Sequence, residues 1–204
     1  GFNKNGATGE DYARLAKAVY DRIHTDFPDV EISAFALARA YADNAANKAK
    51  GYKFMQDALS ADVDGDGKFD LYKYIDIISV HHYLRDVSRI VPRTDELRSL
   101  LSQYGCGGKK IYHTEFGCSA TKTLGGAETQ AVFLAKYAAA MRAYNAGDRF
   151  YIYDFSNNGE DADDFEHNLG IVNYHKSRTP YSAKPSLISL ANLNRIIGNC
   201  EAES

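Results

Sequence analysis

Residues 110–117 read Lys-Ile-Tyr-His-Thr-Glu-Phe-Gly, a short run that ends in a carboxylate and a glycine. Aromatic and β-branched residues favour extended backbone, so the run predicts a strand from Lys110 to Glu115. Three more stretches of this kind lie at residues 30–37, 75–83 and 149–155. Their short apolar runs are typical of strands buried on both faces of a parallel sheet.

Segments with helical periodicity separate these strands. A capping box of Thr8 and Asp11 predicts the start of the first helix. Further helices are expected over roughly residues 40–60 and over residues 127–146. A third helix between them is expected to begin at Thr94, and a last one at Pro185. The predicted order is αβαβαβαβα.

This alternation predicts an α/β fold with a parallel sheet covered by helices, formed as a single domain over residues 1–204. A doubly wound sheet normally carries a Gly-rich phosphate turn after its first strand, and none follows residues 30–37. A barrel instead gathers polar residues at the carboxyl ends of its strands. Polar residues of this kind end three of the strands: His81, His82 and Tyr83, then Glu115, then Tyr153 and Asp154.

Composition excludes several function classes. The 204 residues carry 24 basic and 27 acidic side chains, so no basic surface for nucleic acid is expected. No run approaches the roughly 18 apolar residues that span a membrane. Three cysteines are too few and too scattered for a disulfide framework or a structural zinc site.

Glu115 is the sharpest candidate for chemistry. Strict alternation along the strand would place it on the face of Ile111 and His113. His81 and Tyr83 share one face of the preceding strand, and an imidazole and a phenol beside a carboxylate can keep it ionised and orient it as a nucleophile. The alternative is an ordinary salt-bridged glutamate with hydrogen-bonded histidines at the strand end.

These residues carry a resemblance to a known superfamily. Residues 79–83 and 111–117, together with Glu166-His167-Asn168-Leu169-Gly170-Ile171-Val172 and Lys184-Pro185, resemble the C-terminal half of a clan A retaining glycoside hydrolase. The resemblance runs through the whole chain. It implies a partial TIM barrel whose four parallel strands are equivalent to strands five to eight, with alternating helices.

The resemblance also implies roles for individual residues. Glu115 would be the catalytic nucleophile at the end of the seventh strand, and a carbohydrate would be the substrate. His81 and Tyr83 would contact the sugar and the nucleophile. Tyr153 would stack on the sugar at the end of the eighth strand, where the superfamily commonly has a tryptophan. The superfamily needs no cofactor for this reaction.

The sequence departs from the superfamily in one respect. The acid/base of these enzymes lies on an Asn-Glu pair that ends strand four, and the sequence contains no such pair. Retention requires two carboxyl groups about 5 Å apart. We therefore expect a fragment, or one of two complementary pieces, of a retaining β-glycosidase that lacks turnover by itself. Its partner would be the missing N-terminal barrel half or a complementary chain.

Two other functions remain open. A non-catalytic carbohydrate-binding or scaffold protein could be built on an incomplete barrel. A small nucleotide-binding protein is disfavoured because the sequence has neither a phosphate-binding glycine loop nor its lysine.

A second signal is an acidic loop at residues 62–70, Asp-Val-Asp-Gly-Asp-Gly-Lys-Phe-Asp. Carboxylates at loop positions 1, 3, 5 and 9 with glycine at position 6 are typical of a calcium loop, although position 12 is Lys73. The loop predicts a short structural Ca²⁺ site, with a solvated acidic turn as the alternative. Sugar chemistry and such a loop together favour a secreted or extracytoplasmic protein. The predicted ligands are Asp62, Asp64, Asp66, Asp70 and the backbone carbonyl of Lys68.

Overall fold

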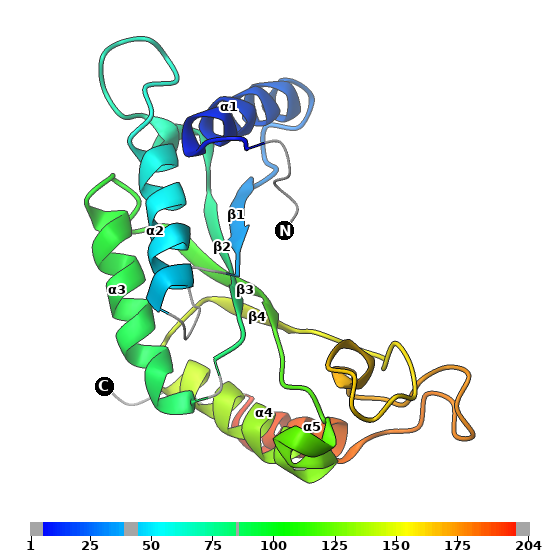
Figure 1. Cartoon of the computed structure of the whole chain (residues 1–204). Coiled ribbons are helices and arrows are strands. Elements are labelled where there is room, and N and C mark those ends of the chain that lie inside the picture. Colours follow the sequence, from blue (N-terminus) through cyan, green and yellow to red (C-terminus); the bar gives the residue numbers. More distant parts are fainter. Residues whose placement is uncertain (1–5, 39–44, 85, 199–204) are drawn as a thin grey trace. The chain divides into compact units, whose positions relative to one another are not determined.

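The computed structural model describes residues 6–38, 45–84 and 86–198. Four strands lie in one sheet in the order β1-β2-β3-β4, and helices alternate with them along the chain (Figure 1). The predicted α/β class with four parallel strands is therefore confirmed. The strands are β1 (Ser33–Leu37), β2 (Ile77–His82), β3 (Lys110–Phe116) and β4 (Arg149–Ile152).

Five α-helices and several short 3₁₀ helices connect the strands within the described part of the chain. The α-helices are α1 (Gly9–Asp26), α2 (Ala45–Leu59), α3 (Ile90–Ser102), α4 (Gly126–Ala143) and α5 (Pro185–Ile197). The 3₁₀ helices are η2 (Leu71–Tyr74), η3 (Val87–Arg89), η4 (Lys122–Leu124) and η5 (Glu166–Asn168). Residues 40–44 of the expected second helix lie outside the described residues.

The chain packs as two compact units. The first holds residues 1–82 and 92–114, and the second holds residues 83–91 and 115–204. The expectation of a single domain over the whole chain stays a prediction.

The first unit begins with the capping box that the sequence predicts. The Thr8 hydroxyl accepts a hydrogen bond from the Asp11 amide at 3.1 Å, and the Asp11 carboxylate accepts one from the Thr8 amide at 2.8 Å. Helix α1 then packs against α2, and Gly9 permits this contact because a Cβ there would lie 2.5 Å from the Phe54 carbonyl oxygen. Tyr12 ties the helix to β1 by accepting a hydrogen bond from the Phe35 amide at 2.6 Å.

The prediction that Thr94 caps the third helix is wrong. Helix α3 already begins at Ile90, and Thr94 is buried inside it. The true start is set by Asp86, whose carboxylate accepts a hydrogen bond from the Ser88 amide and opens η3, which runs directly into α3. Pro92 is tolerated because the first turn of a helix has amides without intrahelical partners.

The second unit is built on α4 and α5, which lie side by side (Figure 1). Phe116, at the end of β3, stacks on Tyr137 of α4 with ring centroids 4.5 Å apart, and both rings are fully buried. Leu190, Leu193 and Ile197 of α5 are only half-buried, because the groove of about 340 Å³ that they line with Phe150 and Ile152 is open.

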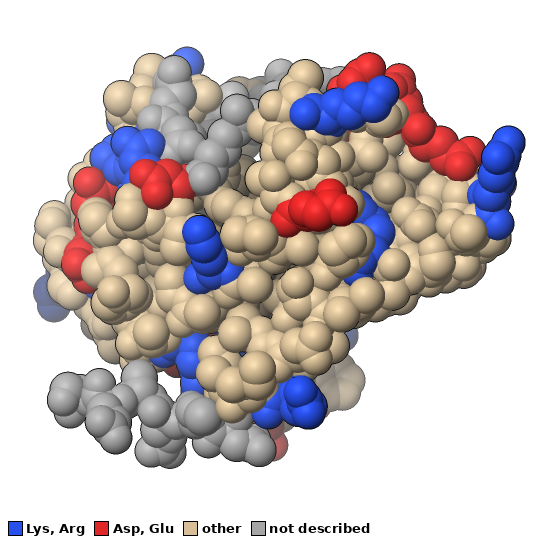
Figure 2. Space-filling view, turned by 90° about the horizontal axis from the view of Figure 1, so that it is seen from below, with Lys and Arg blue, Asp and Glu red and all other residues tan. Residues whose placement is uncertain are grey.

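Large apolar side chains are exposed in both units. They include Leu15, Val19 and Phe27 in the first unit and Phe150, Tyr151 and Ile196 in the second. Figure 2 shows one face of the molecule, on which charged side chains of both signs lie among broad uncharged areas. Among the described residues, no helix combines the length and the hydropathy of a membrane span.

Loss of the capping hydroxyl should destabilise α1. We expect Thr8→Ala to lower the free energy of unfolding by about 1 kcal/mol, because the Asp11 amide loses its acceptor at the helix start. Urea unfolding followed by circular dichroism measures this change. The matched control is Thr25→Ala in the last turn, where the hydroxyl only bonds the Asp21 carbonyl. Equal losses in both variants would contradict the role of the cap.

Candidate active site

Glu115 and Tyr83 meet in the second unit. The Tyr83 hydroxyl donates a hydrogen bond to Glu115 Oε2 at 2.8 Å, and both side chains are half-buried. Glu115 is the penultimate residue of β3, and Tyr83 directly follows β2. Both residues lie at the carboxyl ends of neighbouring strands, as the sequence predicts, and their side chains are in contact.

The environment of Tyr83 keeps its hydroxyl protonated. Burial raises the pKa of Tyr83 far above its usual value, and the hydrogen bond to Glu115 and the carboxylate charge raise it further. A phenol that holds its proton at every physiological pH is a permanent donor. The hydrogen bond from Tyr83 is therefore charge-assisted and holds the Glu115 carboxylate in one orientation.

Burial does not alternate strictly along β3 near Glu115. Ile111 and His113 are fully buried, whereas Thr114 and Glu115, which follow one another, are both half-buried. Phe116 is buried again, against Tyr137. The expectation that Glu115 shares a face with Ile111 and His113 stays a prediction.

Tyr153 follows β4 and lies close to the same carboxylate. Its amide donates a hydrogen bond to the Phe116 carbonyl at 2.8 Å, so the ends of β3 and β4 are joined next to Glu115. Burial raises the pKa of Tyr153, and the charges of Asp154, Glu166 and Glu115 add to this effect. The peptide bond between Tyr153 and Asp154 is cis.

Gly117 permits this close approach of the two strand ends. A Cβ at Gly117 would lie 2.1 Å from the Tyr153 carbonyl oxygen and 3.4 Å from Leu169 Cδ2. Any side chain at this position would push Tyr153 away from Glu115.

Glu166 is a further charged residue near the site, which sequence reasoning assigned to an acidic loop after the eighth strand. Its charge acts on both Tyr83 and Tyr153 and raises the pKa of each, after burial as the main cause. Its place in the loop after the strand of Tyr153 could have indicated a role at the site. That loop, however, holds five acidic residues, and the sequence does not distinguish among them: Glu160, Asp161, Asp163, Asp164 and Glu166.

His81 lies near the end of β2 and is half-buried. It belongs to the first unit, whereas Glu115 belongs to the second. Its role in contacting the sugar or the nucleophile stays a prediction.

The acidic loop in the first unit brings three of the predicted ligands together. Carboxylate oxygens of Asp62, Asp66 and Asp70 lie within 4.8 Å of one another. Asp64 is directed elsewhere: it accepts hydrogen bonds from Lys73 Nζ at 3.0 Å and from the Tyr74 hydroxyl at 2.5 Å. The Lys68 amide donates to Asp66 Oδ1 at 3.0 Å.

The Asp62 carboxylate already caps its own loop. It accepts hydrogen bonds from the amides of Gly65, Asp66 and Gly67, and these bonds lower its pKa. Calcium binding at this loop stays a prediction.

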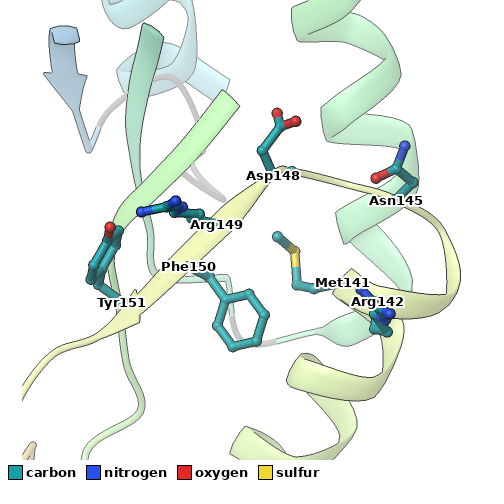
Figure 3. Close-up of a pocket in the computed structure, with 8 residues that line it drawn as sticks. Met141, Arg142, Asn145, Asp148, Arg149, Phe150 and Tyr151 are labelled. Carbon is teal, nitrogen blue, oxygen red and sulfur yellow. The ribbon is translucent and has the colours of Figure 1, made fainter. Parts of the chain in front are cut away.

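A cavity of about 590 Å³ lies at the opposite, amino-terminal end of β4. Met141, Phe150 and the two arginines Arg142 and Arg149 are among the residues that line it. The Arg149 side chain lies on the side of Tyr151, away from Arg142 (Figure 3). The two guanidinium groups do not converge on one point. None of the predicted site residues contributes to this cavity.

Known structures share this fold. A family 39 glycoside hydrolase from Bacteroides cellulosilyticus WH2 matches 96% of the chain with a TM-score of 0.69 and 22% identity. The chain has the fold of part of a glycoside hydrolase barrel. A glucosidase from Croceicoccus marinus matches 95% of the chain at 14% identity with a TM-score of 0.66. A monomeric β-xylosidase from Caulobacter crescentus CB15 matches 90% at 14% identity with a TM-score of 0.60.

The chain spans only part of these structures, between 37% and 40% of their length. No family model and no curated protein sequence matches the chain. The partial-barrel fold is therefore shown by structure, at low sequence identity.

Substitution of Gly117 should disturb the site. We expect Gly117→Ala to lower the free energy of unfolding by about 2 kcal/mol or more, because its Cβ collides with the Tyr153 carbonyl. Gly108→Ala is the matched control, since a Cβ there meets nothing within 4 Å. Chemical unfolding of both variants measures the difference. Equal stability of the two variants would contradict the close contact.

Calcium should stabilise the first unit if the acidic loop binds it. We expect millimolar Ca²⁺ to raise the melting temperature of the wild-type chain, because a bound cation stabilises only the folded state. Asp62→Asn should lose this response, while Asp163→Asn, in the other acidic loop, should keep it. Differential scanning calorimetry measures both. An unchanged wild-type melting temperature leaves only an acidic turn.

Proposed function

We propose that the chain is the nucleophile-bearing part of a retaining β-glycosidase that acts on oligo- or polysaccharides. The observation that carries this proposal is the Tyr83–Glu115 hydrogen bond at the strand ends of a glycoside hydrolase fold. The Tyr153 amide is bonded to the Phe116 carbonyl, which places the backbone of Tyr153 next to that of Glu115 and supports Tyr153 as the aromatic residue of the site.

In this reaction, an oxygen lone pair of Glu115 attacks the anomeric carbon. The glycosidic C–O bond breaks, and its electron pair leaves with the aglycone oxygen, which the acid/base protonates. Water, deprotonated by the same acid/base, then hydrolyses the glycosyl ester and restores the carboxylate. Both steps use carboxyl groups and no cofactor.

Two residues would support the nucleophile. Tyr83 would hold Glu115 in one orientation through its hydrogen bond. The Tyr153 ring would stack on the apolar face of the sugar, since aromatic rings offer a flat apolar surface with a polar edge.

The acid/base would come from a complementary segment. A barrel closes with about eight strands, and this chain supplies four. The exposed edge strand β4 and the open apolar groove beside α5 are the kind of surface that such a segment would cover.

The names of the matched structures suggest a substrate class. The matched structures are named a β-xylosidase and a glucosidase, which supports a β-linked xylose or glucose unit as the first substrate to test. We further propose a secreted or extracytoplasmic location, supported by the polymeric nature of such substrates and the calcium-type loop.

A mechanism-based label tests the role of Glu115 without the missing acid/base. Dinitrophenyl 2-deoxy-2-fluoro-β-xylosides and β-glucosides carry a leaving group that departs as an anion and needs no proton. The fluorine slows hydrolysis of the ester, so the label stays on the nucleophile. We expect peptide mapping by mass spectrometry to find the sugar on Glu115.

Two variants control this experiment. Glu115→Gln should take up no label, because an amide is not a nucleophile of this kind. Glu160→Gln, in the acidic loop, should be labelled like the wild type. Labelling of another carboxylate in the wild type would contradict the assignment of Glu115.

Turnover separates the enzyme from the non-catalytic alternative. The isolated chain should not hydrolyse a nitrophenyl β-glycoside, and co-expression with a segment that supplies an Asn-Glu strand should restore hydrolysis. Sugar binding by calorimetry without labelling or restored cleavage would favour a carbohydrate-binding protein. Turnover by the isolated chain would contradict the need for a complementary segment.

A further inference from the structure

Two buried polar side chains lie beneath the candidate site in the second unit. Gln130 of α4 is fully buried, and Lys184, at the start of α5, is only 6% exposed. A buried lysine is unusual, because removal of its ammonium from water is costly unless a carboxylate compensates. Among the described residues, the hydrogen-bond partners of Lys184 Nζ are all neutral oxygens.

The Lys184 ammonium bonds one short segment of backbone. Nζ donates to the Gly170 carbonyl at 2.6 Å, to the Asn168 carbonyl at 3.3 Å and to Asn157 Oδ1 at 3.1 Å. Lys184 is also the N-cap residue of α5, without a capping hydrogen bond from its side chain, and the helix dipole disfavours a positive charge at this end. Both its burial and its place therefore work against stability.

Gln130 bonds the same segment from the other side. Its Nε2 lies 3.1 to 3.3 Å from the carbonyl oxygens of Asn168, Leu169 and Gly170, and 2.8 Å from that of Cys118. Its Oε1 accepts a hydrogen bond from the buried Ser186 hydroxyl at 3.0 Å, which fixes the orientation of the amide. The carbonyls of residues 168–170 thus all point at buried donors.

This segment in turn contacts the strand ends that carry the site. The Leu169 carbonyl accepts a hydrogen bond from the Asp154 amide at 3.3 Å, and the Ile171 amide donates to the Asp154 carbonyl at 3.1 Å. The Asn168 carbonyl also accepts from the Ala120 amide at 3.0 Å, in the chain that follows Glu115. The segment therefore bridges the backbone after β3 and the backbone after β4.

Two glycines, Gly117 and Gly170, allow these backbone segments to pack closely. A Cβ at Gly170 would lie 2.1 Å from the Asn157 amide nitrogen, as a Cβ at Gly117 would lie 2.1 Å from the Tyr153 carbonyl. A small displacement of residues 168–170 would thus move the backbone of Tyr153 relative to Glu115.

We infer that Lys184, together with Gln130, is a positioning residue of the site. The two side chains hold the carbonyls of residues 168–170, and this segment fixes the Tyr153–Asp154 peptide beside Glu115. The importance of that placement for catalysis rests on the proposed function of Glu115. The placement itself rests only on the hydrogen bonds described above.

Local hydrogen exchange tests the placement directly. In Lys184→Met, which keeps the length of the side chain, peptides covering residues 153–157 and 168–172 should exchange at least ten-fold faster. The interior of α4, residues 131–141, should exchange as in the wild type. Gln130→Met should accelerate the same two peptides, and the control Lys122→Met, at an exposed lysine of the same unit, should change none.

Two results would overturn the inference. One is unchanged exchange at residues 153–157 in Lys184→Met. The other is equally faster exchange in α4, which would show a general loss of stability and no positioning role.

The charge on Lys184 gives an independent pH profile. Burial lowers the pKa of Lys184 from 10.5 to about 8, with the nearby Cys118 thiol as a smaller opposing influence. Between these two pH values the unfolded chain binds more protons than the folded chain, so folding of the wild type becomes more favourable as pH rises. The stability of the wild type relative to Lys184→Met should therefore rise between pH 8 and pH 10. A difference independent of pH would show that Lys184 is not a buried cation, and it would overturn the assignment.

Labelling of Glu115 links the inference to the proposed function. Lys184→Met should take up the fluoro-sugar label about ten-fold more slowly than the wild type, and Lys122→Met at the wild-type rate. Wild-type labelling with no slowing in Lys184→Met would overturn the positioning role. If the wild type itself takes up no label, the proposed function fails, and the exchange experiment still decides the placement.

Discussion

The structure of the candidate site depends on how closely the ends of β3 and β4 approach each other. The Tyr153 amide bonds the Phe116 carbonyl at 2.8 Å, and only the absence of a Cβ at Gly117 leaves room for the Tyr153 carbonyl. This contact sets the Tyr153 backbone one residue away from Glu115. Tyr83 approaches Glu115 from the chain after β2. A carboxylate, a phenol donor and an aromatic ring thus share one end of the second unit.

The interior of the second unit, next to the contact between the ends of β3 and β4, is polar. Three polar residues are buried beside Leu169 and Gly170: Gln130, Lys184 and Ser186. Apolar side chains in these places would avoid the free-energy cost of removing polar groups from water. Their hydrogen bonds satisfy carbonyls that irregular backbone leaves without strand or helix partners. Loops that shape a site need such internal partners, because they have no regular secondary structure to supply them.

The exposed apolar surface follows from the same architecture. Strand β4 ends the sheet, and the residues of α5 that line the neighbouring groove are only half-buried. The matched glycoside hydrolases are about two and a half times longer than this chain, since it covers 37% to 40% of them. The four strands of the described sheet are half of the eight that close such a barrel.

Sequence by itself determined the order of elements and the residues most suited to chemistry. Short apolar runs with aromatic and β-branched residues predicted the four strands of the sheet, and the Thr8–Asp11 pair predicted the start of α1. The place of Glu115 at a strand end made it the leading candidate. These features are local, because they depend on residues a few positions apart. Tertiary structure decided the rest. The hydrogen bond between Tyr83 and Glu115, and the hydrogen bonds of Gln130 and Lys184 to the carbonyls of residues 168–170, join segments far apart in the sequence. Their energies depend on burial and on partners that no local pattern specifies.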